Sequence, residues 1–131
     1  MSTAQSDTKP TIVLIHGAFA DGTSWQHVIP LLEQNGYSVL AVQIPLSSVP
    51  DDVATTKRAI DFVKGPVVLV GHSYGGVVIT GAGAGAPNVK ALVYIAAYAR
   101  RSTKPSAPRP PHTRRRRSLP RSPRTRVATS I

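Results

Sequence analysis

The chain has 131 residues, enough for one domain with a hydrophobic core and too short for two ordinary domains. It contains no cysteine, which excludes disulfide frameworks, thiolate zinc sites and thiol nucleophiles. The formal net charge of +10 is uneven: residues 1–99 hold five Lys or Arg and six Asp or Glu, whereas residues 100–131 hold eleven Lys or Arg and no acid. We therefore expect a flexible N-terminus over residues 1–10, an ordered domain over 11–99 and a disordered basic tail over 100–131.

The sequence offers no signal for export or membrane insertion. The first ten residues are polar and lack the basic and apolar regions of a secretory signal. The longest stretch without a formal charge, residues 65–88, is interrupted by two prolines and several glycines. We interpret this stretch as a strand, a turn and a buried helix. The expectation is a cytoplasmic protein without a membrane partner.

Apolar runs of strand length alternate with segments of helical character. The first run, TIVLIH over residues 11–16, is β-branched and ends at a glycine, which is typical of a buried strand. A helix is predicted to begin near Thr23, where Gln26 completes a capping box, and to end before Gly36. A second strand is predicted over residues 38–44.

The second half of the domain repeats this alternation. A helix is predicted from Asp51 to Lys64, because acidic residues favour a helix N-terminus. Strands are predicted over residues 67–70 and 90–98, with a helix rich in glycine and alanine between them. Strands alternating with helices indicate a parallel sheet with helices on both faces. The expected fold class is therefore α/β, a doubly wound parallel sheet of about four strands.

The stretch Gly71-His72-Ser73-Tyr74-Gly75 joins the third strand to the helix after it. A serine framed by glycines two positions away is the pattern of a nucleophile elbow, although a lone match is more often a simple turn. The sharp turn strains the serine backbone, and side chains in place of the two glycines would collide. The turn raises the serine oxygen beside a helix N-terminus, where the N–H of Tyr74 can face a developing oxyanion. We predict Ser73 as the nucleophile.

A second element supports this prediction, because His16-Gly17-Ala18-Phe19 follows the first strand. In an elbow enzyme a loop at this place supplies the other oxyanion donor, here the N–H of Phe19 or Ala18. The side chain of His16 is predicted to shape the loop by hydrogen bonding, since its place ahead of the serine argues against a role as base. Gly17 and His72 are predicted to support the loop and the elbow.

The segments VLIHGAFADGTSW, VVLVGHSYGG and ALVYIAAYA together resemble the α/β-hydrolase superfamily. The resemblance is strongest to its compact esterase-like branch, which includes plant methylesterases and hydroxynitrile lyases, and it covers residues 10–99. It implies the third to sixth strands of an eight-strand plan. It also implies hydrolysis of a small ester-like substrate through an acyl-serine, with no metal or organic cofactor. Lyase chemistry uses the same elbow and stays open.

The resemblance also shows what this chain lacks. In the family the catalytic triad runs Ser, then Asp or Glu, then His along the chain. After Ser73 the sequence has no Asp or Glu, and its only later histidine is His112. Asp51, Asp52 and Asp61 precede the serine, and we interpret them as helix-start and solvent-face charges. Because loss of triad members lowers the rate of catalysis by a factor of about 10⁴–10⁶, we expect this chain alone to be nearly inactive.

The tail over residues 100–131 contains ten Arg, one Lys and six Pro. Its composition is what GC-rich DNA yields in a wrong reading frame, and GC-rich codons for residues 100–107 can encode an acidic, helix-forming segment in a shifted frame. One hypothesis is therefore a truncated or frameshifted hydrolase.

The alternative to this hypothesis is a non-catalytic scaffold or basic protein that binds nucleic acid non-specifically through the tail. The open apolar edge of the last strand also predicts self-association.

Overall fold

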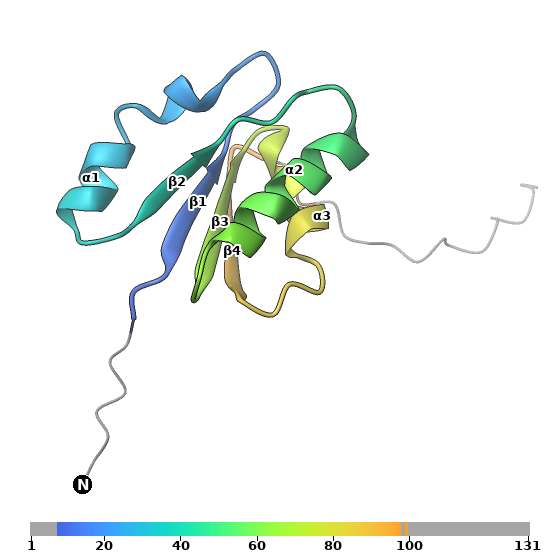
Figure 1. Ribbon diagram of the computed structural model, residues 1–131. Helices are drawn as coiled ribbons and strands as arrows, with labels where there is room; N and C mark the ends of the chain where they lie inside the picture. The colour runs from blue at the N-terminus through green and yellow to red at the C-terminus, as the bar shows by residue number, and fades with distance from the viewer. Residues whose placement is uncertain (1–7, 98, 100–131) are drawn as a thin grey trace, which may run out of the picture.

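The computed structural model describes residues 8–97 and 99, and Figure 1 shows their arrangement. The predicted tail over residues 100–131, including His112, lies outside the described residues, as does most of the predicted N-terminal segment. In chain order the elements are β1 (Thr11–Ile15), the 3-10 helix η1 (Gly22–Trp25), α1 (Ile29–Gln34), β2 (Val39–Val42), α2 (Val49–Phe62), β3 (Val67–His72), α3 (Gly75–Gly83) and β4 (Val89–Ile95).

The strands form one sheet in the order β2-β1-β3-β4, and every neighbouring pair is parallel. Ile15 is paired with Val42 on one side and with Gly71 on the other, and Gly71 is paired with Tyr94. The carboxyl ends of the strands therefore meet at one edge, where open α/β sheets place their sites. The predicted fold class, an α/β doubly wound parallel sheet, is confirmed.

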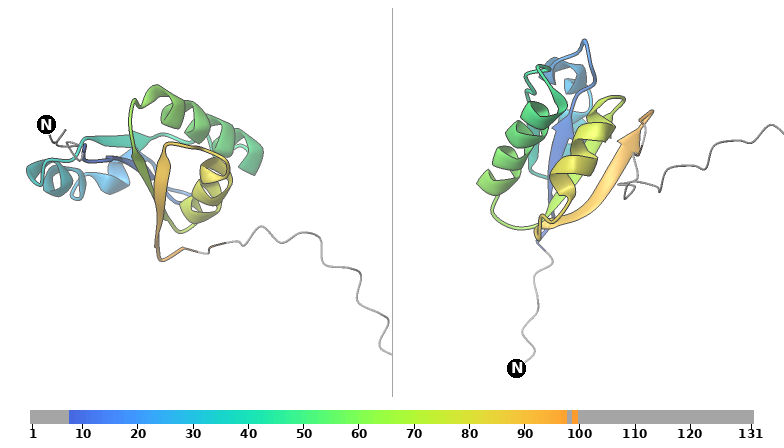
Figure 2. Two further views of the ribbon diagram at one scale, coloured as in Figure 1. Left: turned by 90° about the horizontal axis from the view of Figure 1, so that it is seen from below. Right: turned by 90° about the vertical axis from the view of Figure 1, so that its right-hand side faces the viewer.

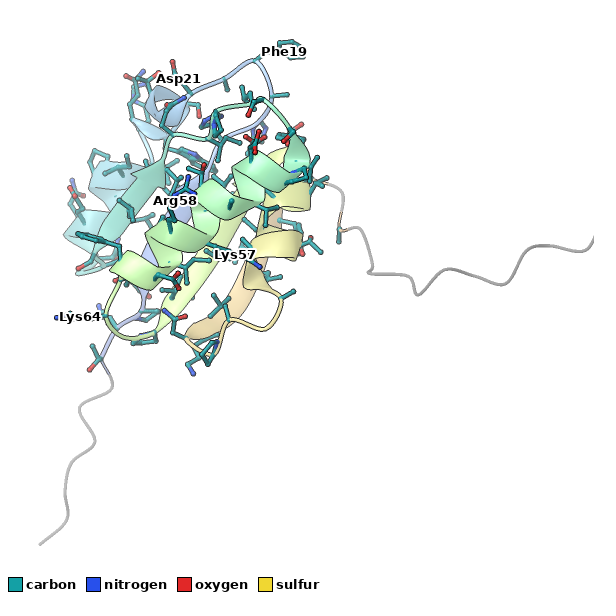
Figure 3. The ribbon with its side chains drawn as sticks, turned by 45° about the vertical axis from the view of Figure 1, so that its right-hand side comes forward. Phe19, Asp21, Lys57, Arg58 and Lys64 are labelled. Atoms are coloured by element: carbon teal, nitrogen blue, oxygen red, sulfur yellow. The ribbon has the colours of Figure 1, made fainter. Side chains whose placement is uncertain are left out.

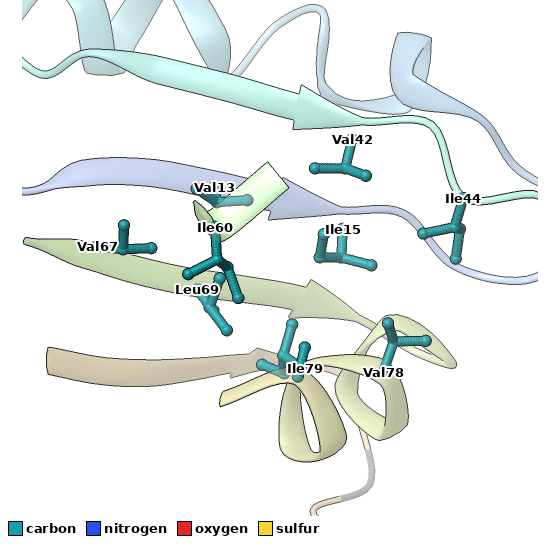
Figure 4. Packing of buried hydrophobic residues seen from close by; sticks show 10 residues of the cluster. Val13, Ile15, Val42, Ile44, Ile60, Val67, Leu69, Val78 and Ile79 are labelled. Atoms are coloured by element: carbon teal, nitrogen blue, oxygen red, sulfur yellow. The ribbon is translucent and has the colours of Figure 1, made fainter. Parts of the chain in front are cut away.

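Helices α2 and α3 cover one face of the sheet and α1 lies on the other (Figures 1 and 2). Alternate residues of β1 point to the two faces, as the pleat requires: Val13 and Ile15 face α2 and α3, whereas Ile12 and Leu14 face α1. The larger core cluster lies under α2 and α3, and Figure 4 shows its packing. Its buried members are Val13, Ile15, Val42, Ile44, Ile60, Val67, Leu69, Val78, Ile79 and Ala82.

The face beneath α1 is only partly covered. Its buried cluster consists of Ile12, Leu14, Trp25 and Val70, packed against η1 and α1. Beyond this cluster an apolar groove of about 410 Å³ extends to β4, where Val93 and Ile95 are 41% and 44% exposed. Among the described residues no strand pairs with the outer edge of β4.

The predicted single helix from Thr23 is wrong. Two helices, η1 and α1, occupy this segment, and the N-cap of η1 is Asp21, whose side chain accepts a hydrogen bond from the backbone N–H of Thr23 at 2.8 Å. Pro30 lies in the first turn of α1. Because proline has no N–H to donate to the preceding turn, it suits a helix start and interrupts a continuous helix.

The predicted boundaries of the other elements shift by a few residues. Helix α2 begins at Val49 with Ser48 as its N-cap, two residues before the predicted start at Asp51. Strand β3 extends to His72, beyond the predicted end at residue 70. Within the described part of the chain, no helix combines the length and apolar character that crossing a membrane requires.

Candidate active site

The candidate site lies at the carboxyl edge of the sheet, where β3 turns into α3. Ser73 occupies this turn with φ 51°, a left-handed conformation that residues other than glycine seldom adopt. Its backbone N–H donates to the Ile95 carbonyl at 3.1 Å, and its own carbonyl accepts from the N–H of Gly76 at 3.0 Å. The serine is exposed to solvent. Strain of this kind costs about 1–3 kcal/mol and persists only where the surroundings impose it.

The two framing glycines explain how the surroundings impose this strain. A Cβ on Gly71 would lie 2.6 Å from the carbonyl carbon and oxygen of Gly75. A Cβ on Gly75 would lie 2.5 Å from the Ile15 carbonyl oxygen and 2.9 Å from that of His16. These neighbours are backbone atoms, which cannot move aside as a flexible side chain does. The close approach of α3 to β1 and β3 therefore requires glycine at both positions.

The loop after β1 lies directly against the elbow. A Cβ on Gly17 would lie 3.3 Å from the Ser73 Cβ and 3.3 Å from Nδ1 of His72. Phe19 adopts φ 60° and its fully exposed side chain lies at the outer tip of this loop (Figure 3). Within the described part of the chain, no hydrogen bond takes up the backbone N–H of Tyr74, Ala18 or Phe19. These three donors therefore have no hydrogen-bond partner among the described residues.

His16 uses both ring nitrogens inside the protein. The side chain is fully buried, and its Nε2 accepts a hydrogen bond from the backbone N–H of Ile44 at 3.2 Å. Nδ1 must then hold the proton, and it donates to the Gly17 carbonyl at 2.8 Å. The ring thus ties the loop after β1 to the end of β2, and neither nitrogen is available to a serine.

The other two described histidines are exposed and make ring or side-chain contacts of their own. His72 is exposed and meets the edge of the Trp25 ring, with ring centroids 6.4 Å apart and planes at 86°. His27 is exposed, and its Nε2 lies 3.3 Å from the Gln26 side-chain nitrogen. Within residues 8–97 and 99, no three His, Asp or Glu side chains gather as a metal-binding group.

Asp52 lies in the first turn of α2, as predicted for a helix-start charge, but its interpretation as a solvent-face charge is wrong. This side chain is fully buried: Oδ1 accepts from the Leu46 backbone N–H at 2.8 Å, and Oδ2 accepts from the Tyr74 hydroxyl at 2.6 Å. Burial and this carboxylate raise the pKa of Tyr74 to about 12. The helical repeat offered a signal, since Asp52, Thr56 and Ile60 share one face of α2 and all three are buried.

The neighbouring acids match their interpretation better. Asp51 is exposed at the start of α2, and hydrogen bonds from Ser47 and Ser48 lower its pKa below the ordinary value. Asp61 is also exposed. The outward face of α2 bears Lys57 and Arg58, and Lys64 follows the end of the helix (Figure 3).

A pocket of about 420 Å³ opens beside the elbow and the loop after β1. The residues of all three free donors, Ala18, Phe19 and Tyr74, line it, and so does Asp52. The segment after β2 adds Leu46, Ser47 and Ser48 to the lining, and Val49 of α2 completes it. The site thus combines an exposed serine in a left-handed turn, unpaired backbone donors and an adjacent pocket lined by Tyr74 and not by Ser73 itself.

Comparison with known proteins agrees with this geometry. The sequence model of the alpha/beta hydrolase family matches residues 12–130. A carbendazim hydrolyzing esterase from Nocardioides is 34% identical over 99 residues, which are 66% of this chain and 41% of that protein. An alpha-hydroxynitrile lyase from Arabidopsis thaliana is 29% identical over 106 residues, 70% of this chain and 41% of the lyase.

Among solved structures, a pyrethroid hydrolase from Sphingobium faniae superposes with a TM-score of 0.62 at 31% sequence identity. The superposition covers 69% of this chain and 40% of that one. The chain therefore spans about two-fifths of the length of these relatives.

Proposed function

Because this chain belongs to the alpha/beta hydrolase family, we propose that its site has the chemistry of a serine hydrolase acting on small carboxylic esters. The observation that carries the proposal is the left-handed Ser73 at the β3–α3 turn, with Gly17 packed against it. The esterase relative at 34% identity supports the substrate class.

In the proposed reaction the Ser73 hydroxyl oxygen attacks the ester carbonyl carbon while its proton passes to a base. The carbonyl oxygen becomes an oxyanion, which accepts hydrogen bonds from the N–H of Tyr74 and the N–H of Ala18 or Phe19. The helix dipole of α3 adds positive potential at the same place. Collapse breaks the bond to the leaving oxygen, which takes up the proton from the base and departs as the alcohol, and water then hydrolyses the remaining acyl-serine.

We infer that none of the described histidines serves as an oriented base for this reaction. His16 has both nitrogens engaged, while His27 and His72 lie on other contacts. After Ser73 the sequence supplies neither an Asp nor a Glu to orient a histidine. We therefore propose that the chain alone is a slow catalyst, with a rate lower by a factor of about 10⁴–10⁶ than that of an enzyme with a complete triad.

Covalent labelling tests the nucleophile directly. Purified protein is incubated with a fluorophosphonate and the modified residue is mapped by peptide mass spectrometry. We expect slow labelling at Ser73 that Ser73→Ala abolishes, whereas Ser38→Ala, a change at an exposed serine, leaves it intact. A folded protein that stays unlabelled, or labelling that persists in Ser73→Ala, contradicts the proposal.

Lyase chemistry is the second candidate, and the hydroxynitrile lyase relative is the observation that favours it. Parallel assays of ester and cyanohydrin cleavage, each with Ser73→Ala, distinguish the two. The alternative of a basic scaffold that binds nucleic acid depends on residues 100–131, outside the described part. Binding that falls steeply with salt concentration is its test.

A further inference from the structure

Asp52 is a buried carboxylate whose partners come from two other segments. Each carboxylate oxygen accepts one hydrogen bond, from the Leu46 backbone N–H and from the Tyr74 hydroxyl. No lysine, arginine or histidine forms an ion pair with it in residues 8–97 and 99. Burying an unpaired charge is costly, and short bonds to a carboxylate are the strong kind that offsets the cost. Asp52 thus joins α2, the segment after β2 and the residue that follows Ser73.

The same three segments surround the pocket beside the elbow. Leu46 adopts φ 57°, so the segment after β2 turns through a conformation that needs support. Tyr74 has φ −54°, directly after the left-handed Ser73. Its side chain is anchored at the phenol oxygen on one side of the pocket, while its backbone N–H lies at the start of α3.

We propose that Asp52 is a positioning residue for the oxyanion site. It holds the Tyr74 phenol and so fixes the direction of the Tyr74 backbone N–H against the strain stored at Ser73. Through Leu46 it also fixes the opposite wall of the pocket. The inference rests on the proposed function, because the direction of this N–H matters only if an oxyanion forms beside Ser73.

The matched control is Tyr94 of β4, a second tyrosine whose hydroxyl also takes part in a side-chain hydrogen bond. The Tyr94 hydroxyl lies 2.9 Å from Thr80 Oγ1 of α3, so Tyr94→Phe also removes a hydrogen bond to α3, but away from the elbow. Tyr74→Phe removes the bond to Asp52. Asp52→Asn keeps an acceptor for the Leu46 N–H and offers a donor to the phenol oxygen, whereas Asp52→Ala keeps neither.

The first readout is the rate of fluorophosphonate labelling, separated into the maximal inactivation rate and the concentration for half-maximal rate. Hydrogen bonds to the oxyanion stabilise the transition state of the labelling reaction, so they affect the maximal inactivation rate. We expect Tyr74→Phe and Asp52→Ala to lower the maximal rate about 10-fold to 100-fold, the range of a weakened oxyanion donor. Asp52→Asn should keep most of the native maximal rate that Asp52→Ala loses. Tyr94→Phe should stay within about twofold of the native rate. Equal rates for Tyr74→Phe and Tyr94→Phe overturn the inference.

The second readout does not need a reactive serine. Hydrogen exchange of peptides spanning residues 44–48 and 72–76 is followed by mass spectrometry. We expect faster exchange in both peptides for Tyr74→Phe and Asp52→Ala, and native exchange there for Tyr94→Phe. If native protein is never labelled, the proposed function fails, and exchange still decides whether Asp52 fixes the elbow. Native exchange in Tyr74→Phe and Asp52→Ala overturns the inference.

Discussion

The two faces of the sheet are covered to different extents. Under α2 and α3, side chains such as Val13, Leu69 and Ile79 are fully buried. On the face of α1, a helix of six residues leaves Val93 and Ile95 more than 40% exposed. Tyr74 packs against the larger cluster. The start of α3 is therefore supported by the complete face, whereas the Ser73 N–H and the His72 ring contact Ile95 and Trp25, which line the open face.

The largest expected effect separates the two faces directly. Leu69→Ala removes a fully buried side chain from the larger cluster and should lower the free energy of unfolding by about 2–5 kcal/mol. Ile95→Ala trims a half-exposed side chain beside the groove and should cost less than about 1 kcal/mol. Urea denaturation of both variants measures the difference. Equal losses would show that the groove is covered in solution.

A second test concerns the packing beneath the elbow. Gly75→Ala places a Cβ 2.5 Å from a backbone oxygen, so we expect a loss of about 3 kcal/mol or outright failure to fold. Gly22→Ala is the matched control, because its Cβ would meet only side-chain atoms at 3.6 and 3.9 Å. That variant should stay within about 0.5 kcal/mol of the native protein by urea denaturation. Gly75→Ala with native stability would contradict the packing of the elbow.

The open face also predicts self-association. Val93 is exposed on β4, whose outer edge has no partner strand among the described residues. We expect the apparent mass in analytical ultracentrifugation to rise with protein concentration, and Val93→Lys to weaken this rise, because a charge on an edge strand opposes pairing. Lys90→Arg, which keeps the charge of β4, is the control. A native protein that stays monomeric at high concentration would contradict the expectation.

The sequence predicted the strands and the elbow because their signals are local. Runs of β-branched residues predict β1 and β3. The glycines at positions 71 and 75 predict a tight turn, and the structure shows that a Cβ at either position would collide with backbone atoms. Asp52 escaped because a carboxylate after Asp51 looks like a helix-start charge, and its partners lie 6 and 22 residues away. A buried polar bond of this kind is set by tertiary packing, which local patterns do not contain.

The pKa of Tyr74 predicts a response at alkaline pH. Its folded value of about 12 exceeds the ordinary 10.0, so the folded state holds the proton more tightly than the unfolded state. The resulting stability is fully present below pH 10 and is lost as the pH rises toward 12. The stability advantage of the native protein over Tyr74→Phe should therefore shrink over this range in urea denaturation. An advantage that stays constant to pH 12 would contradict the buried hydrogen bond.

The smallest effect on stability is expected at the exposed start of α2, because solvent screens the charge of Asp51 there. The Ser47 hydroxyl donates to Asp51 Oδ2 at 2.8 Å, and this bond is the main cause of the lowered Asp51 pKa. A lowered pKa stabilises the fold above the ordinary value of 3.8, and the benefit is lost as the pH falls through the folded value. Ser47→Ala should therefore destabilise the protein slightly at pH 7 and not at pH 2.

The control for this change is Ser24→Ala, which removes a hydroxyl bonded to the Asp21 carbonyl and no bond to a carboxylate. Its effect on unfolding should not vary between pH 2 and pH 7. Asp52 also lies at the start of α2. If Ser47→Ala lowers the stability as much at pH 2 as at pH 7, Ser47 stabilises the conformation of this segment and does not act through the Asp51 charge. If Ser47→Ala instead lowers stability only at neutral pH, the Ser47 bond acts through the Asp51 charge alone. The contact of α2 with the elbow then depends on the Asp52–Tyr74 hydrogen bond and not on Ser47.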